Sequence, residues 1–352
     1  MASSKKNKKL GVGVIGVGSI GPYHVQGYTE HPDCEVVAIC DINLARGNAV
    51  ANKFGVKTVV AEYKKMLAMD AVEAVSVCVP NYLHAEMTIA AFQAGKHVVC
   101  EKPLATSPKE GEAMVAASKK AGKLFMTAFN NRFRGDTQVL KKFIDNGELG
   151  DIYYAKTGWI RRKGIPGMGG WFTTKAKSGG GPLLDIGCHV LDLTLWLMGN
   201  PKAVTVSGST YAMFGPKGEG MGGWGTAEKG GSCDVEDLAC GLIRFDNGAT
   251  VFVEASWASH IEKDVFYSNL MGTKGGADVE PFRVYKDMHG TTVDITPGFP
   301  EQEGHITEVK HFVDCVTKNQ PLVATGQHGL DIIRILDALY RSAASGKEIS
   351  LK

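Results

Sequence analysis

The sequence predicts an α/β protein of two domains. A doubly wound parallel sheet is expected over residues 1–130, followed over 131–352 by an α+β domain with a large, mostly antiparallel, open sheet. In the first third, short strands that are apolar on both faces alternate with helical segments, as in a parallel sheet covered on both sides. From about residue 150, longer strands alternate apolar and polar residues, which is typical of antiparallel sheets. The chain of 352 residues is long enough for two hydrophobic cores.

The first domain is predicted to alternate strand and helix along its whole length. The expected strands are 10–16, 35–40, 74–79, 96–100 and 124–129. The expected helices end near residues 30 and 54, and then span about 83–94 and 108–121. Because parallel strands joined through helices take right-handed crossovers, this order predicts a doubly wound sheet.

The second domain is predicted to contain longer strands and two glycine-rich loops. The expected strands are 152–160, 203–214, 238–245 and 249–258, and the tripeptide DNG at 246–248 indicates a hairpin between the last two. Segments 164–181 and 215–232 hold too many glycines for strands and are expected to be loops. For 215–232 a disordered segment is the alternative.

The charge of the chain argues against a nucleic-acid or acidic membrane partner. The net charge is +2, and Lys5, Lys6, Lys8 and Lys9 of a basic tail, which we expect to be flexible over residues 1–9, supply four positive charges. The remainder is therefore close to neutral.

The cysteines and the hydropathy pattern predict a cytoplasmic protein without a membrane span. The eight cysteines lie singly, with no C-x-x-C pair, which is typical of a reducing compartment. No stretch approaches the roughly 18 unbroken apolar residues of a membrane helix. The apolar run behind the basic tail is glycine-rich and is interpreted as a first strand, not as a secretion signal.

A glycine motif follows the first predicted strand and opens the first predicted helix. The segment GVGSIG places Gly16, Gly18 and Gly21 where a backbone must turn tightly and approach a pyrophosphate at the helix N-terminus. Asp41, twenty residues after Gly21, ends the second strand. A carboxylate there accepts hydrogen bonds from a ribose diol and repels a 2′-phosphate, which favours NAD over NADP. A cap for the following helix is the alternative role for Asp41.

Polar residues follow three further predicted strands. These residues are Pro80-Asn81 with His84, Glu101-Lys102-Pro103, and Asn130-Asn131. Because ligands bind outside the carboxyl ends of strands in open α/β sheets, one shared crevice is expected. Lys102 follows a buried strand and precedes a proline, so its backbone is restricted and its ammonium can donate or tune a proton. An exposed loop lysine is the alternative.

The stretch LLDIGCHVLDLTLWLM at 183–198 is apolar except for three side chains. Asp185, His189 and Asp192 are spaced four and three apart, so an α-helix would place them in one line. There are three alternatives. Asp185 can be an acidic residue in the first turn that interacts with the helix dipole, or the His and Asp side chains can simply hydrogen-bond each other. The three side chains can also bind a metal, although no further ligand at suitable spacing supports this. A further interpretation is acid–base chemistry on an alcohol, with His189 as base and Asp192 supporting it.

The order of these motifs resembles the Gfo/Idh/MocA family of NAD(P)-dependent sugar and inositol dehydrogenases. The resemblance rests on GxGxxG, the aspartate after strand two, P-N-x-x-H, E-K-P, G-G-x-x-x-D-I-G-x-H-x-x-D and the closing segment GLDIIRILDALYRSAASGKEISL. It implies a Rossmann domain, a catalytic Lys102, a general base at His189, a substrate-orienting Asp185, and a homodimer or homotetramer formed through the C-terminal sheet. The cofactor-binding set that it implies, together with the strand ends, is Gly16, Gly18, Ser19, Ile20, Gly21, Asp41, Pro80, Asn81, His84, Glu101, Lys102 and Asn130.

The segment before the motif helix is similar to the branch of the family that acts on hexoses and glucosides. It carries Arg161, Arg162 and Trp171, which can bind sugar hydroxyls and stack on a pyranose. The expected substrate-binding set is Lys102, Arg161, Trp171, Asp185 and His189. The expected activity is NAD-dependent oxidation of a ring hydroxyl, preferably at C3. Inositol 2-dehydrogenation, a redox-neutral NAD-dependent glycosidase and a non-catalytic cofactor-sensing regulator are the alternatives.

Overall fold

The computed structural model describes residues 8–351, which form two compact units. The first unit holds the chain up to Leu104 together with 109–133 and 303–327, and the second holds 105–108, 134–302 and the chain from His328 onward. The structure therefore corrects the predicted boundary at residue 130, because a late segment returns to the first unit. Of the predicted flexible tail, residues 1–7 lie outside the described part, and Lys8 forms an ion pair with Glu73 at 3.0 Å.

The late segment returns because its helix packs on the first helix of the chain. Helix α9 (Gly304–Lys318) lies against α1 (Gly21–Glu30) in the first unit. Gly27 allows this approach, since a Cβ built on it would lie 2.1 Å from the Val309 side chain. The amphipathic pattern of 304–318 predicts a helix but not which sheet the helix covers.

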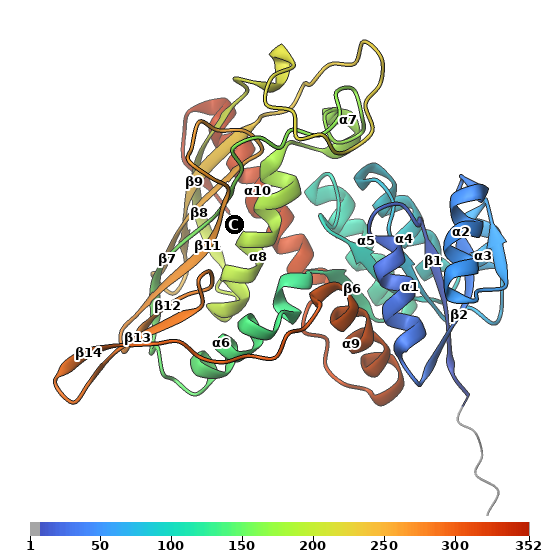
Figure 1. Cartoon of the computed structure of the whole chain (residues 1–352), viewed down its shortest axis with the longest axis horizontal. Coiled ribbons are helices and arrows are strands. Elements are labelled where there is room, and N and C mark those ends of the chain that lie inside the picture. The colour runs from blue at the N-terminus through green and yellow to red at the C-terminus, as the bar shows by residue number, and fades with distance from the viewer. Residues whose placement is uncertain (1–7, 352) are drawn as a thin grey trace, which may run out of the picture. The chain divides into compact units, whose positions relative to one another are not determined.

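The first unit is built on a six-stranded sheet in which every pair is parallel (Figure 1). Its order is β3-β2-β1-β4-β5-β6, which confirms the doubly wound prediction. The strands are β1 (Leu10–Ile15), β2 (Cys34–Cys40), β3 (Thr58–Val60), β4 (Ala74–Val77), β5 (His97–Glu101) and β6 (Phe125–Ala128). The helices are α1, α2 (Leu44–Phe54), α3 (Tyr63–Leu67), α4 (His84–Gln93), α5 (Pro108–Ala121) and α9, with 3₁₀ turns η1 (Asn81–Leu83) and η2 (Asn130–Phe133). The short β3 and α3 were not predicted, because segments of three and five residues show no clear period.

The strand order of the first unit creates a switch point beside β1. Strand β1 lies between β2 and β4, so the connections leave it in opposite directions. In such sheets the crevice outside the strand ends at the switch point is the ligand site. The glycine motif follows β1 and the Pro80-Asn81 segment follows β4.

The second unit is built on a nine-stranded sheet of order β14-β13-β12-β11-β7-β10-β9-β8-β15. Only the central pair β7–β10 is parallel, so the sheet is mostly antiparallel as predicted. Its strands are β7 (Ile152–Ile160), β8 (Ala203–Tyr211), β9 (Leu238–Phe245), β10 (Thr250–Ser256), β11 (Val265–Gly272), β12 (Gly276–Asp278), β13 (Arg283–Met288), β14 (Thr291–Ile295) and β15 (Ile349–Ser350). The predicted hairpin at 246–248 joins β9 to β10.

One face of this sheet is covered by helices (Figure 1). The helices of the second unit are α6 (Gly135–Asp145), α7 (Lys175–Ser178), α8 (Cys188–Leu197) and α10 (Gly326–Ser345, from His328 in this unit), with a 3₁₀ turn η4 (Gly215–Lys217). Every residue of α8 is buried, and α8 packs on β7 and β11. From α10, Leu339 packs on Gly208 and Gly241 of the sheet.

The predicted helix at 183–198 consists of two kinds of helix. Leu183–Gly187 forms a π-helix, η3, and only then does the α-helix α8 begin at Cys188. The expectation of one regular α-helix is therefore corrected at its first turn. Because a π turn is wider than an α turn, Asp185 and His189 do not follow the simple i, i+4 line. Such turns are found frequently at functional sites.

The described residues include no helix that is long and apolar enough to cross a lipid bilayer.

Candidate active site

The glycine loop after β1 leaves room for a ligand beside the N-terminus of α1. Gly16 has φ +86°, and a Cβ there would lie 2.3 Å from the carbonyl oxygen of Cys78. A Cβ on Gly21 would lie 2.1 Å from the carbonyl oxygen of Gly16, so these two glycines close the turn. Around Gly18, in contrast, a Cβ would meet nothing within 4 Å. Gly18 and Ser19 are exposed, and no side chain caps α1 at Ile20, so its first N–H groups are available to an anion.

Asp41 is held in the first unit by four hydrogen bonds. Its carboxylate accepts from the backbone N–H of Val17 and of Asn43, and twice from the Arg46 guanidinium at 2.8 and 3.0 Å. Burial acts to raise the pKa of Asp41, but Arg46 and the two backbone donors outweigh it and hold the pKa below its usual value. The cap of α2 is Asn43, not Asp41. Arg46 was not considered in the sequence interpretation, and a cation here favours a 2′-phosphate.

His84 fixes the loops that follow β4 and β5. Its side chain is fully buried, with Nδ1 2.8 Å from the carbonyl oxygen of Pro103 and Nε2 2.8 Å from that of Val79. Burial lowers the pKa of His84, although the two carbonyls act in the opposite direction. The imidazole therefore ties two strand ends together and presents no surface to a ligand. Asn81, beside it, is 5% exposed, and Pro80 is half-buried.

Glu101 and Lys102 end β5 in a constrained turn. Glu101 is buried, and its Oε1 lies 2.9 Å from Nε2 of His24 on α1. Burial acts to raise the pKa of Glu101, but the bond to His24 outweighs it and lowers the pKa. The backbone N–H of Lys102 donates to Glu101 Oε2 at 3.2 Å, and the Lys102–Pro103 peptide bond is cis. Lys102 itself is half-buried, and Asn130, which begins η2 after β6, is half-buried as well.

Asp185 and His189 are both buried in the second unit, each with 8% of its surface exposed. The indole Nε1–H of Trp257, which is fully buried after β10, donates to Asp185 Oδ2 at 3.0 Å. The ring of His189 lies 5.9 Å from that of Trp159 on β7. Asp192 is 1% exposed and lies deeper in α8. The clusters of three metal-ligating side chains in the described residues do not include this stripe.

A second buried carboxylate holds the start of the π-helix. Glu236 accepts from the backbone N–H of Gly181 at 2.9 Å and of Leu183 at 3.2 Å, and from the hydroxyl of Tyr340 at 2.7 Å. Burial raises the pKa of Glu236 above its usual value, although its three donors act in the opposite direction. Glu236 thus satisfies donors that a helix start otherwise leaves unpaired. It positions the turn that carries Asp185.

Aromatic side chains and one arginine line the same part of the second unit. Trp171 stacks on Phe172 with ring centroids 3.6 Å apart, and Phe172 meets Trp224 edge-on at 5.0 Å. The guanidinium of Arg161 lies over Trp159 at 4.9 Å and over Trp224 at 5.6 Å. One face of Trp171 is therefore already covered by Phe172.

The neighbouring Arg162 has a role in a turn. Its backbone N–H donates to Asp264 Oδ1 and its Nη1 to the carbonyl oxygen of Glu262.

The two glycine-rich loops are paired with each other by backbone hydrogen bonds. The N–H of Gly164 donates to Gly220, that of Gly167 to Trp224, and that of Glu228 to Met168. The disordered alternative for 215–232 is therefore not supported.

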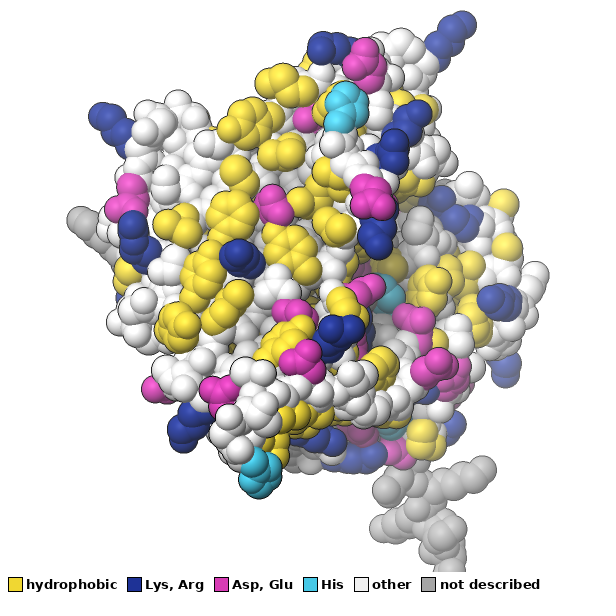
Figure 2. Space-filling view, turned by 60° about the vertical axis from the view of Figure 1, so that its left-hand side comes forward, with side chains coloured by type: hydrophobic (Ala, Val, Ile, Leu, Met, Phe, Trp, Pro, Cys, Tyr) yellow, Lys and Arg dark blue, Asp and Glu magenta, His cyan; other side chains and the backbone are white. Residues whose placement is uncertain are grey.

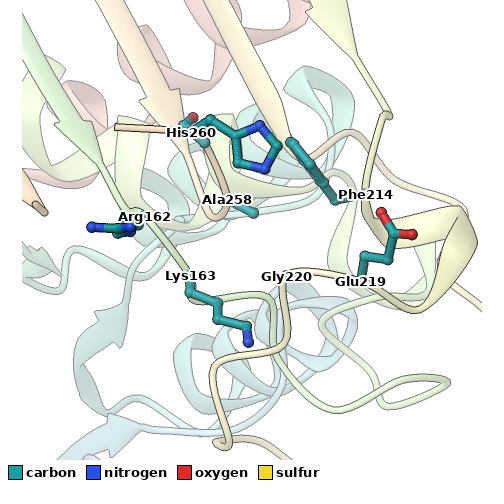
Figure 3. A pocket seen from close by; sticks show the side chains of 8 residues that line it. Arg162, Lys163, Phe214, Glu219, Gly220, Ala258 and His260 are labelled. Atoms are coloured by element: carbon teal, nitrogen blue, oxygen red, sulfur yellow. The ribbon is translucent and has the colours of Figure 1, made fainter. Parts of the chain in front are cut away.

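A cavity of about 320 Å³ lies at the edge of this region, also within the second unit. Figure 3 shows Lys163 and Arg162 on one side of it, Glu219 on another, and Phe214 beside His260. The rings of Phe214 and His260 meet edge-on at 5.1 Å. Of the residues that the sequence singled out for substrate or cofactor, Arg162 lines this cavity and the others do not.

Sequence reasoning missed four residues that define the neighbourhood of Asp185 and His189: Trp159, Trp224, Glu236 and Trp257. Trp257 lies within the predicted strand 249–258 and was not singled out. Its partner Asp185 is 72 residues away along the chain, so no local pattern could reveal the bond. In the first unit, the missed residues are His24 and Arg46.

A dinucleotide-type glycine loop at the switch point of a parallel sheet, with a second unit that holds a buried aspartate and a buried histidine, defines an NAD(P)-dependent oxidoreductase. Residues 10–129 match the model described as "Oxidoreductase family, NAD-binding Rossmann fold", and 137–278 match the "GFO/IDH/MocA C-terminal domain". The chain is 34% identical to D-glucoside 3-dehydrogenase of Escherichia coli (strain K12), with 100% of both chains covered. It is 32% identical to levoglucosan dehydrogenase of Pseudarthrobacter phenanthrenivorans, over 96% of this chain and 97% of that one.

The fold comparison agrees with the sequence comparison. A solved levoglucosan dehydrogenase in complex with NADH and levoglucosan matches with a TM-score of 0.85 and 26% identity, over 97% of this chain and 99% of that one. The chain belongs to the Gfo/Idh/MocA family of oxidoreductases.

Proposed function

We propose that the protein is an NAD-dependent dehydrogenase that oxidises one ring hydroxyl of a hexose or glucoside, preferably at C3, reversibly to a keto-sugar. The observation that carries the proposal is the burial of Asp185 and His189 in a largely apolar helical segment, where the indole N–H of Trp257 donates to Asp185. Burying two ionisable groups costs folding free energy unless hydrogen bonds or ion pairs compensate it fully, and such groups are often found at functional sites. The similarity to a D-glucoside 3-dehydrogenase and to levoglucosan dehydrogenases supports a sugar as substrate.

The first unit would hold the cofactor through its glycine loop. The open space at Gly18 and the uncapped first turn of α1 fit a pyrophosphate. Asp41 at the end of β2 would bind the ribose diol. NAD, when bound, supplies the hydride acceptor.

The choice of NAD over NADP depends on the Asp41–Arg46 pair. Asp41 favours a free ribose diol. Arg46 could bind a 2′-phosphate, but only if the Arg46 guanidinium broke its hydrogen bonds to Asp41. Because two hydrogen bonds hold Arg46 to Asp41, we expect NAD to be preferred. Asp41→Asn should weaken that hold and move the ratio of kcat/KM values toward NADP. A wild-type preference for NADP would contradict this assignment.

The chain's own residues would move the proton. Oxidation of a carbinol takes a hydride from carbon and a proton from oxygen, and a histidine is suited to accept that proton near neutral pH. We assign this role to His189, with Lys102 placed against the same hydroxyl and Asp185 binding a neighbouring hydroxyl. Lys102 belongs to the first unit and the other two to the second; we propose that all three act on one substrate molecule.

The aromatic side chains and Arg161 would form the sugar-binding surface. Trp159, Trp171 and Trp224 offer rigid faces to a pyranose, and Arg161 can donate to its hydroxyls. Since one face of Trp171 is covered by Phe172, only its other face can stack.

The deciding experiment measures NADH absorbance with purified protein, NAD and a panel of glucose, glucosides, levoglucosan and inositols. We expect reduction of NAD with a glucoside and a C3 ketone in the product by NMR. Preference for inositols would replace the substrate assignment. Cleavage of a glycoside without net NADH would indicate a redox-neutral hydrolase, and no turnover together with NADH binding would indicate a sensor.

The base is tested with His189→Ala. We expect at least about a 100-fold loss of kcat, the usual scale of a lost acid–base group, with the Kd for NADH unchanged. His289→Asn, at the exposed turn between β13 and β14, is the matched control and should keep full turnover. Near-normal turnover of His189→Ala would overturn the assignment.

We also propose that the outer face of the nine-stranded sheet joins copies of this chain. Cross-strand pairing places Leu242, Phe252, Tyr267 and Met271 on the face opposite the helices, and all four are half-buried. Figure 2 shows yellow side chains gathered on this side of the molecule. An extended apolar surface of this kind is typical of an interface.

The assembly is tested by light scattering after gel filtration. We expect a homodimer or homotetramer for the wild type, and smaller species for Phe252→Glu. A wild-type monomer at micromolar concentration would contradict the proposal.

A cytoplasmic location, supported by eight free cysteines, is tested by fractionation.

A further inference from the structure

A chain of buried hydrogen bonds runs beneath Lys102 in the first unit. The hydroxyl groups of Tyr28 and Ser76 are 2.7 Å apart, and Ser76 Oγ lies 2.9 Å from Nδ1 of His24. Nε2 of His24 lies 2.9 Å from Glu101 Oε1, and Glu101 Oε2 accepts from the backbone N–H of Lys102 at 3.2 Å. His24, Tyr28 and Ser76 have no exposed surface.

These hydrogen bonds connect α1, the helix that follows the glycine loop, to the end of β5. His24 lies on α1 only three residues after Gly21, while Ser76 lies on β4 and Glu101 ends β5. Each ring nitrogen of His24 therefore has a partner on a different strand of the sheet. An imidazole held at both nitrogens has a fixed ring orientation, which fixes the Glu101 side chain in turn.

A second carboxylate confines the same imidazole. Glu308 on α9 is fully buried, and its ligand atom lies within 4.8 Å of those of His24 and Glu101. His305 Nδ1, also on α9, lies 3.6 Å from Glu308 Oε1. Residues 304–318, which carry both side chains, lie outside the two segments matched by the family models, 10–129 and 137–278. Burying two carboxylates around one imidazole costs folding free energy, which suggests that the arrangement has a function.

We infer that His24 and Glu101 form a positioning pair for Lys102. His24 orients the Glu101 carboxylate, and that carboxylate accepts a hydrogen bond from the backbone N–H of Lys102. These two hydrogen bonds thereby fix the direction in which the Lys102 side chain leaves the strand. Because Glu101 has both oxygens engaged, it is a positioning residue and not a proton carrier to substrate. The inference rests on the proposed role of Lys102.

The pair also links cofactor binding to the lysine. The N-terminus of α1 borders the glycine loop, and His24 lies on the next turn of this helix. A displacement of α1 would be passed through His24 and Glu101 to Lys102. Misplacement of a reacting group by about 1 Å can cost roughly 100-fold in rate, so a small loosening of this pair is measurable.

The test compares His24→Leu, which removes both hydrogen bonds, with His24→Gln, whose amide can still donate to Glu101. We expect kcat to fall about 10- to 100-fold in His24→Leu, with KM and the Kd for NADH changed less than threefold, and to recover in large part in His24→Gln. His97→Gln, at the opposite end of β5, is the matched control and should keep its kcat. Equal losses in the Leu and Gln variants, or no loss in either, would overturn the inference.

A double-mutant comparison separates this inference from the proposed function. If Lys102→Met keeps wild-type turnover, the role of Lys102 is wrong and the positioning pair falls with it. If Lys102→Met loses turnover, His24→Leu should add little further loss in that background, because it acts through the lysine. The same loss in both backgrounds would show that His24 only supports the fold.

A second readout uses cofactor-free protein and needs no turnover. We expect acetylation of Lys102 by acetic anhydride, mapped by mass spectrometry, to be at least threefold faster in His24→Leu than in the wild type. Lys96, whose Nζ donates to the carbonyl oxygen of Met69 near the start of β5, is the internal control. If His24→Leu does not fold, Glu101→Gln replaces it, with the same expectation. An unchanged Lys102 rate, or a stoichiometric metal ion on His24, Glu101 and Glu308, would overturn the inference.

Discussion

The indole N–H of Trp257 donates to Oδ2 of Asp185 at 3.0 Å, from a ring with no exposed surface. This bond joins the end of β10 to the π-turn that precedes α8. Because the Trp257 ring is buried and held in place, its N–H fixes the position of Oδ2 of Asp185. The position of the other carboxylate oxygen, Oδ1, is fixed as a result. If Asp185 binds the sugar as proposed, its orientation before the sugar arrives would reduce the entropy cost of binding.

Trp257→Phe keeps most of the buried ring and removes only the donor. We expect kcat/KM for the sugar to fall at least about tenfold, since a hydrogen bond to a charged group contributes roughly 1.5–3 kcal/mol, while the Kd for NADH stays the same. Steady-state kinetics and NADH fluorescence titration measure the two effects. Trp196→Phe, in a buried indole on α8, is the control for loss of packing. A sugar kcat/KM equal to that of the wild type would show that Asp185 needs no such support.

Gly18 and Gly21 should respond to alanine in opposite ways. At Gly18 a methyl group enters open space, so we expect a folded protein with an unchanged melting temperature whose affinity for NADH falls at least about tenfold, because backbone contact with the pyrophosphate is lost. At Gly21 the methyl group would lie 2.1 Å from the Gly16 carbonyl oxygen, so we expect lower thermal stability as well. Calorimetry and isothermal titration distinguish the two. Tight NADH binding by Gly18→Ala would place the cofactor elsewhere.

The Asp41–Arg46 pair should make the stability of the cofactor-free protein depend on pH in the acid range. The pKa of Asp41 is lowered in the folded state, so its contribution is complete above the unfolded value of about 3.9 and is lost as the pH falls through the lower folded pKa. Relative to the wild type, Asp41→Asn should be less stable by roughly 2 kcal/mol at pH 6. The difference should shrink below about pH 4. Urea unfolding over pH 3–7 measures it, and a difference that does not vary with pH would contradict the role of the ion pair.

The sequence predicted those elements that have a regular pattern. Strands β7 and β9 were predicted with their observed bounds, 152–160 and 238–245. The segment IYYAKTGWI is rich in β-branched and aromatic residues, and LACGLIRF is a short, largely apolar run before the turn signal DNG. The segment RVYKDM of β13 is mostly polar and has no such pattern, and it pairs only with β12 and β14 toward one edge of the sheet. Strands β11–β14 were therefore missed.

The site was predicted as a set of residue types and not as a set of contacts. Asp185, His189 and Lys102 were proposed because a polar group in an apolar run is conspicuous and because their motifs resemble a family. His24, Glu236 and Trp257 were missed because their partners lie 77, 55 and 72 residues away. The π-turn was also missed, because its residues carry no signal that distinguishes them from an ordinary helix start.

The return of α9 to the first unit limits how this protein can be divided in the laboratory. A fragment ending near residue 133 would include all six strands of the parallel sheet but would lack the helix that covers Gly27 on α1. A chimera that exchanges substrate domains with a relative at that single point would replace this helix by a foreign one. Such grafts therefore need two junctions, so that residues 303–327 remain with the parallel sheet against which they pack.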